Sequence, residues 1–133
     1  MRATTLRRSM AVVAATGLAL LAAVAYAKPS GNWRIKFDHR ADNDGAITLR
    51  IAPIEGGGDP IDVETKIPSG TSENNAAELV SASLKAVLGT EKYRIGIDDG
   101  EDVIVRTRGK TKKFELTMVS TTLTGLGVKI KHN

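Results

Sequence analysis

The fold of this chain is decided by residues 71–89, which read TSENNAAELVSASLKAVLG. Apolar and small side chains recur there at helical spacing, which predicts a helix that buries one face. Thr71 or Ser72 can cap its start, and Glu73 places negative charge where the helix dipole favours it. Gly89 can end the helix because glycine adopts a positive φ without steric cost. The expected buried face consists of Ala76, Leu79, Val80, Ser83, Leu84, Val87 and Leu88.

The other ordered segments alternate polar and apolar residues, which is the pattern of a strand with one buried face. One helix among such strands predicts an α+β fold in the order βββ-α-βββ(β). We expect a single two-layer domain, a mainly antiparallel sheet of six to seven strands with one helix packed on one face. The first two strands should form a hairpin, and the third and fourth should be parallel neighbours. The predicted strands are residues 32–38, 46–52, 61–67, 93–97, 103–105, 114–118 and 128–131.

The first 27 residues have the plan of a secretory signal peptide. Basic residues precede an almost wholly apolar run at 11–24, and residues 25–27 read Ala-Tyr-Ala, a small–x–small cleavage pattern. The run is short for a membrane-spanning helix, which needs about 20 residues. We therefore expect cleavage after Ala27 and export to the periplasm or the medium. The mature domain would be residues 28–133, with no transmembrane segment after cleavage.

The net charge and the absence of cysteine argue against several classes of protein function. The whole chain is +4, but three basic residues lie in the leader, so the mature part carries 16 basic and 15 acidic residues, a net +1. This near-neutral balance argues against a nucleic-acid binder. The chain has no cysteine. A disulfide scaffold, a thiol redox role and a thiolate metal site are therefore excluded.

Basic residues gather late in the chain. From residue 106 to the end there are seven basic residues and a single acid, Glu115. Such a basic hairpin can contact an acidic protein, an anionic glycan or an envelope surface. Phe114 is the only aromatic residue nearby, so base stacking on nucleic acid has little support. The alternative is that the charges only protect strand edges from pairing with neighbours. The candidate binding patch consists of Arg106, Arg108, Lys110, Lys112 and Lys113.

Acidic residues form two clusters that resemble parts of metal sites. Asp98, Asp99, Glu101 and Asp102 are the candidates for calcium, but a solvated turn is the favoured interpretation. The second cluster, residues 42–45, reads Asp-Asn-Asp-Gly like the centre of an EF-hand loop. Its register places non-ligand residues at two required ligand positions, so we interpret it as a hairpin turn. No metal and no cofactor are expected.

Catalysis has little support in this sequence. His39 and His132 are the only histidines, and no nucleophile motif accompanies either of them. Trp33 alternates with apolar residues, so we expect it in the core and not as an exposed platform. The sequence favours a small exported, non-catalytic binding or interaction module. The alternative is an inhibitor or assembly subunit that adds its edge strand to a partner sheet, and a carboxylate- or calcium-dependent hydrolase is less favoured.

Overall fold

The computed structural model describes residues 28–54 and 58–133. The expected leader at 1–27 and part of the glycine-rich loop, residues 55–57, lie outside the described residues, so cleavage after Ala27 stays a prediction. The described chain confirms the α+β class and the predicted element order. Its elements are β1 (Asn32–Asp38), β2 (Gly45–Pro53), β3 (Ile61–Ile67), α2 (Glu73–Leu88), β4 (Tyr93–Asp98), β5 (Asp102–Thr107), β6 (Phe114–Thr121) and β7 (Gly127–His132).

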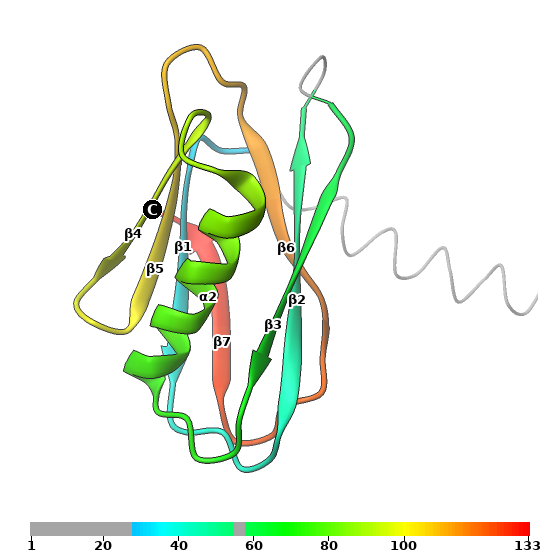
Figure 1. Ribbon diagram of the computed structural model, residues 1–133. Helices are drawn as coiled ribbons and strands as arrows, with labels where there is room; N and C mark the ends of the chain where they lie inside the picture. The colour runs from blue at the N-terminus through cyan, green and yellow to red at the C-terminus, as the bar shows by residue number, and fades with distance from the viewer. Residues whose placement is uncertain (1–27, 55–57) are drawn as a thin grey trace, which may run out of the picture.

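The seven strands divide into two antiparallel sheets (Figure 1). One sheet has the order β4-β5-β1-β7, and the other has the order β3-β2-β6. The predicted hairpin of the first two strands is wrong, because β1 pairs with β5 and β7 while β2 pairs with β3 and β6. The predicted parallel pairing of the third and fourth strands is also wrong. Helix α2 carries the chain from β3 in one sheet to β4 in the other.

The segment between β1 and β2 explains why these strands do not pair. Ala41 is buried, its N–H donates to the Thr71 carbonyl at 3.0 Å, and its carbonyl accepts from the Gly70 N–H at 2.8 Å. The Asp42 N–H donates to the Thr124 carbonyl at 2.8 Å. Gly125 has φ +86° and leaves no room for a side chain, since an added Cβ would lie 2.5 Å from the Arg40 carbonyl oxygen. The segment is therefore a crossing between sheets that two other loops fix, and not a hairpin turn.

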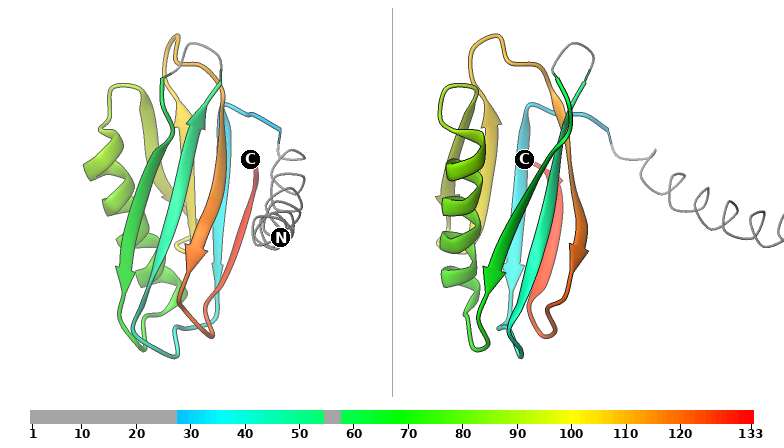
Figure 2. Two further views of the ribbon diagram at one scale, coloured as in Figure 1. Left: turned by 90° about the vertical axis from the view of Figure 1, so that its right-hand side faces the viewer. Right: turned by 45° about the vertical axis from the view of Figure 1, so that its right-hand side comes forward.

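Helix α2 closes the opening between the two sheets. It contacts β3 on one side and β4, β5 and β1 on the other (Figure 2). Ser72 caps the helix, because its side chain accepts from the Asn75 N–H at 3.3 Å, and Gly89 ends it with φ 72°. Its buried residues are Ala76, Ala77, Val80, Ser81 and Leu84.

The predicted buried face of α2 is partly wrong, because Leu79 is 38% exposed and Val87 is 53% exposed. A helix that lies between two sheets needs small residues where the strands approach most closely. Ala77 and Ser81 meet that need, although neither belongs to the predicted apolar face. The buried face of α2 is therefore rotated about the helix axis, relative to the predicted face, towards Ala77 and Ser81.

The core lies between the sheets and beneath the helix. Trp33 is 4% exposed, which confirms its predicted place in the core. Its indole N–H donates to the Phe114 carbonyl at 2.9 Å, so the one polar atom of the ring is paired. The ring of Phe114 in turn meets Tyr93 edge to face at 5.3 Å. These contacts join β1, β4 and β6, and so they fix the two sheets to each other near the ends of these strands.

A candidate anion-binding face

The register of β4 on β5 places like charges opposite each other. Arg94 and Arg106 are direct partners in this antiparallel ladder. Two pairs further along, beyond Tyr93 and Thr107, the Arg108 N–H donates to the Lys92 carbonyl at 2.8 Å, so these two cationic residues are also opposite. Alternate residues of a strand share one face of the sheet. Lys92, Arg94, Arg106 and Arg108 thus form a group of four cations, here called the basic block.

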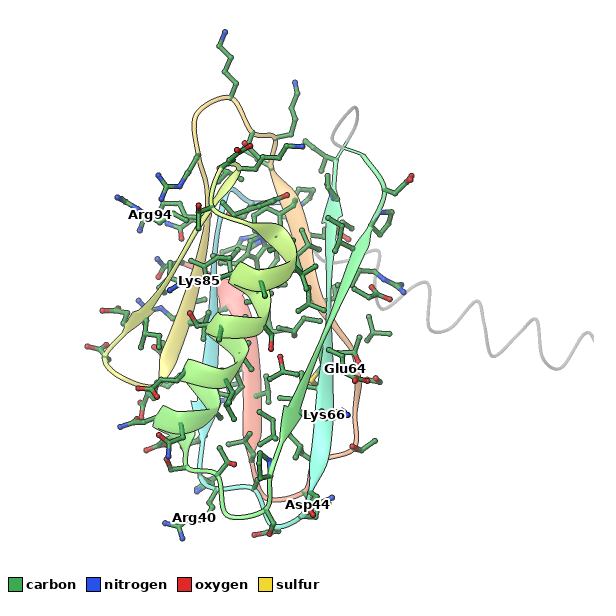
Figure 3. All side chains as sticks on the ribbon, in the orientation of Figure 1. Arg40, Asp44, Glu64, Lys66, Lys85 and Arg94 are labelled. Carbon is green, nitrogen blue, oxygen red and sulfur yellow. The ribbon has the colours of Figure 1, made fainter. Side chains whose placement is uncertain are left out.

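The basic block lies on the outer face of the four-stranded sheet. Tyr93, Ile95 and Val105 are buried on the inner face, so the residues that alternate with them point outward. Arg94 accordingly extends away from α2 and from the second sheet (Figure 3). Like charges directly opposite each other on antiparallel strands are destabilising. The block is therefore an arrangement that the fold tolerates and does not need.

Arg34 organises the next part of the same face. Its guanidinium donates to the Asp98 carboxylate at 2.7 Å and also to the Asp102 carboxylate, and its Nε–H donates to Asn133 Oδ1 at 2.9 Å. The hydrogen bond that Arg34 donates to Asp98 is the largest cause that raises the pKa of Arg34, and the one that it donates to Asp102 is the second. The side chain of Asp102 is only 6% exposed, so its charge needs this cation. Arg34 is thus a structural residue whose charge is already balanced.

Two shallow hollows flank the basic block. The first, of about 540 Å³, is lined by Lys92, Arg108, Lys110 and Lys112, with Glu91 as the one acidic residue. The second, of about 300 Å³, includes Arg34, Arg94, Arg106 and Asp98 together with Gly96 and Ile104. An anionic group in the first hollow would therefore meet cations just before β4 and just after β5, and one in the second hollow would meet Arg94 of β4 and Arg106 of β5.

No carboxylate of the described residues forms an ion pair with the basic block. Among residues 28–54 and 58–133, ion pairs join Arg34 to Asp98 and Asp102, Arg50 to Asp62, and His39 to Asp38. None of these pairs includes a cation of the block or of the turn that follows β5. This end of the molecule thus has a positive field that the described residues do not neutralise.

The structure divides the predicted basic patch between two places. Arg106 and Arg108 belong to the basic block, and Lys110 and Lys112 line the hollow beside it. Lys113 is exposed but lines neither hollow. Sequence reasoning missed Lys92, which directly precedes β4, and Arg94, which lies in β4. The signal that could have found them is the turn before β5, because an antiparallel hairpin centred there places Arg94 opposite Arg106.

The acidic candidates have other roles. Asp98 and Asp102 both bind Arg34, whereas the nearby charge of Glu73 raises the pKa of Glu101. Asp99 lies in the turn between β4 and β5 with a φ of 54°. Within the part of the chain that the structure describes, no group of three or more His, Cys, Asp or Glu side chains could hold a metal ion.

The EF-hand-like segment is also engaged in structure. The Asn43 side-chain amide donates to the Thr122 carbonyl at 2.9 Å, and its oxygen accepts from the Thr124 N–H at 2.8 Å. The Asp44 carboxylate accepts from the Ser69 N–H at 2.8 Å. These bonds tie the crossing between the sheets to the loops beside it.

The two histidines are also far from any cluster that resembles a catalytic site. His39 is 77% exposed and lies 3.8 Å from the Asp38 carboxylate. The ring of His132 meets Trp33 edge to face at 4.5 Å, and its Nε2 lies 2.7 Å from the Lys28 carbonyl oxygen. The first is a surface side chain, and the second covers the edge of the core.

Comparisons with protein-family models and with curated proteins give no match to this sequence. Over the described ranges, no helix has both the length and the apolar character needed to span a membrane.

Proposed function

We propose that the protein is a small exported, non-catalytic binding module that holds an anionic partner on the basic block. The observation that carries this proposal is two like-charge pairs, Arg94 with Arg106 and Lys92 with Arg108, which form no ion pair with any carboxylate of residues 28–54 and 58–133. Such pairs cost stability in the free protein. An anion placed between them would remove that cost, so the arrangement favours the bound state.

The partner that fits best is an extended acidic polysaccharide. The four aromatic rings among the described residues, those of Trp33, Phe37, Tyr93 and Phe114, are all buried. Recognition would therefore rest on charge and hydrogen bonds, without the ring stacking that single-stranded nucleic acid uses. Among the residues that line the two hollows, Ile97 is the one large apolar side chain classed as exposed, whereas protein–protein interfaces are dominated by several buried anchors. Successive cation pairs lie about 7 Å apart along the strands, which suits a ligand with regularly repeated anionic groups.

The test is binding of the exported chain to dextran sulfate and polygalacturonate at several salt concentrations. The double variant Arg94→Glu/Arg106→Glu should lose at least about tenfold in affinity, equivalent to about 1.4 kcal/mol. The matched control is Arg40→Glu/Lys66→Glu, which makes the same change in net charge away from the block (Figure 3). It should change affinity by less than about twofold at moderate salt, because screening limits distant charges.

Two comparisons decide the class of partner. Vesicles of anionic lipid and an acidic peptide are tested for binding to the same two double variants. The difference in affinity between the two variants should be smaller for these probes than for the polysaccharides. Equal losses for the two double variants, or binding that does not weaken with salt, would contradict the proposal, since a charge-specific site requires both effects.

A further inference from the structure

Strands β6 and β7 end their sheets on the side of the molecule away from α2 (Figure 2). No strand of the described chain pairs with β7 on the side away from β1. The start of β6 is covered, because Ser30 and Phe114 exchange two backbone hydrogen bonds of 2.9 and 3.0 Å. β6 and β7 are not hydrogen-bonded to each other. Within residues 28–54 and 58–133, the edge of β7 therefore has no strand partner along its length.

The ladder identifies which backbone groups of β7 are free. The Asn133 N–H donates to the Asn32 carbonyl at 3.0 Å, which makes this pair a hydrogen-bonded one. Hydrogen-bonded and non-hydrogen-bonded pairs alternate in an antiparallel ladder. Val128, Ile130 and His132 therefore direct their N–H and C=O groups away from β1. Together they present three donors and three acceptors to an incoming strand.

An apolar groove lies beside this edge. It has a volume of about 520 Å³, and Trp33, Leu116, Met118 and Ile130 form its apolar lining. Met118 is 38% exposed, so part of its apolar surface in this groove is open to a ligand. A strand added to β7 would direct every second side chain into this groove. Those side chains should be apolar.

The other side chains of the added strand would meet cations. Lys129 and Lys131 lie on the outer face, opposite Lys36 and Arg34 of β1, and β7 contains no acidic residue. A second copy of this chain is disfavoured, because two β7 strands side by side would bring these lysines together. Acidic side chains on the incoming strand would instead be attracted.

We propose that β7 accepts an extended segment of another protein in which apolar and acidic residues alternate. The backbone of that segment would pair with Val128, Ile130 and His132, its apolar side chains would fill the groove, and its acidic ones would contact Lys129 and Lys131. This is strand addition at a free sheet edge. The interaction is independent of the basic block, which lies on the other edge strand of this sheet and on its partner β5.

The probe is a capped peptide that alternates valine and glutamate and matches the six residues of β7 in length. Saturating peptide should slow hydrogen exchange at the amides of Val128, Ile130 and His132 by at least about tenfold. The amides of Lys129 and Lys131 should change little, because the ladder already bonds them to β1. This alternation is specific to edge pairing. Loose attraction between charges would not produce it.

Matched probes sharpen the test. Methylation of the peptide nitrogens that face β7 should abolish protection, whereas methylation of the alternate nitrogens should not. A peptide that alternates valine and lysine should not protect the native chain but should protect Lys129→Glu/Lys131→Glu. Proline at Lys129 is unsuitable as a test, because it would remove a bond within the β1–β7 ladder itself.

Three results would overturn the proposal. The first is no protection at any peptide concentration. The second is equal protection by the lysine peptide of the native chain. The third is protection of the same amides that rises with protein concentration without peptide, which would identify a second copy as the occupant. The variant Arg94→Glu/Arg106→Glu should keep peptide protection, so failure of the basic block and failure of the β7 edge are distinguishable.

Discussion

The outer face of the four-stranded sheet has two places where like charges are opposite each other, and only one of them has a counter-charge among the described residues. Towards the turn between β4 and β5, Asp98 and Asp102 are opposite each other, and Arg34 reaches across to bind both. Towards the other end of the same two strands, Arg94 and Arg106 are opposite each other, and no described carboxylate binds either. The two regions share a backbone geometry and a sheet face. They differ in the sign of the opposed charges, in the burial of Asp102, and in whether a counter-charge from a described residue is present.

We infer from this difference that the Arg34 cluster stabilises the fold, whereas the basic block is available for binding. The Arg34 cluster is required by the fold, because removal of the cation would leave a carboxylate that is almost completely buried. The basic block has no such role, because its side chains are exposed and form no ion pair with a described carboxylate, although the Arg108 Nε–H donates to the Tyr93 carbonyl at 3.4 Å. Charges that cost stability and are not balanced internally suggest an external partner. The predictions below separate the two regions by their effects on stability and on binding.

The largest expected effect is on stability at the Arg34 cluster. Arg34→Met should lower the melting temperature by on the order of 10 °C or more, because Asp102 stays buried without its cation. Arg94→Met, on the same face, should change it by only a few degrees. Thermal unfolding followed by circular dichroism measures both. Similar small shifts for the two variants would remove the distinction between the regions.

The loop crossing gives a second large effect on stability. Gly125→Ala should destabilise the protein, because the new Cβ would overlap the Arg40 carbonyl and the residue has a positive φ. A loss of about 1–3 kcal/mol is typical of strain at such positions. Gly109→Ala is a suitable comparison, because Gly109 also has a positive φ but nothing lies within 4 Å of its added Cβ. Chemical denaturation should therefore show a smaller loss for Gly109→Ala, and equal losses would mean that the close approach is unimportant.

An intermediate and opposite effect is expected within the basic block. Arg106→Glu places a carboxylate opposite Arg94 and should stabilise the protein by about 0.2–1 kcal/mol. The same change should weaken binding to an acidic polysaccharide. A rise in stability together with a loss of binding is the pattern of a functional site that is not optimised for stability. A variant that loses both would instead place Arg106 among the structural residues.

The smallest expected effect on stability comes from repulsion between the carboxylates of Glu73, at the start of α2, and Glu101. The charge of Glu73 raises the pKa of Glu101, so the folded state holds this proton more tightly than the unfolded state does. Stability should therefore fall as the pH rises from about 4, the ordinary region for glutamate. Glu101→Gln should raise the melting temperature by a few degrees at most at neutral pH and should lose this advantage below about pH 4. A difference that does not depend on pH would exclude repulsion as its cause.

The sequence predicts the elements of this fold better than their pairing. The existence of the helix, the Ser72 cap and the alternation around Trp33 follow from local signals, and the structure agrees with each of them, although the buried face of the helix differs in part from the predicted one. The pairing of β1 with β5 and β7 depends on residues more than sixty positions away, and no local pattern encodes it. The same turn residues, Asp42 to Gly45, suit a hairpin and a crossing between sheets equally well.

The sequence likewise predicted only part of the candidate site. Arg106 and Arg108 belong to a basic run that is visible in the sequence. Lys92 and Arg94 lie in a segment with mixed charges, and they become part of the site only through the register of β4 on β5. The separation of Arg34 from the basic block also needs the structure, because three strands converge on Arg34.

The most direct test of the central claim follows the arginine side chains one by one. In a nitrogen-15 spectrum, each Nε–H reports on its own surroundings while dextran sulfate is added. The resonances of Arg94 and Arg106 should shift first, whereas those of Arg34 and Arg50, which already bind carboxylates, should shift little. Uniform shifts, or earlier shifts at Arg50 than at Arg94, would contradict the account.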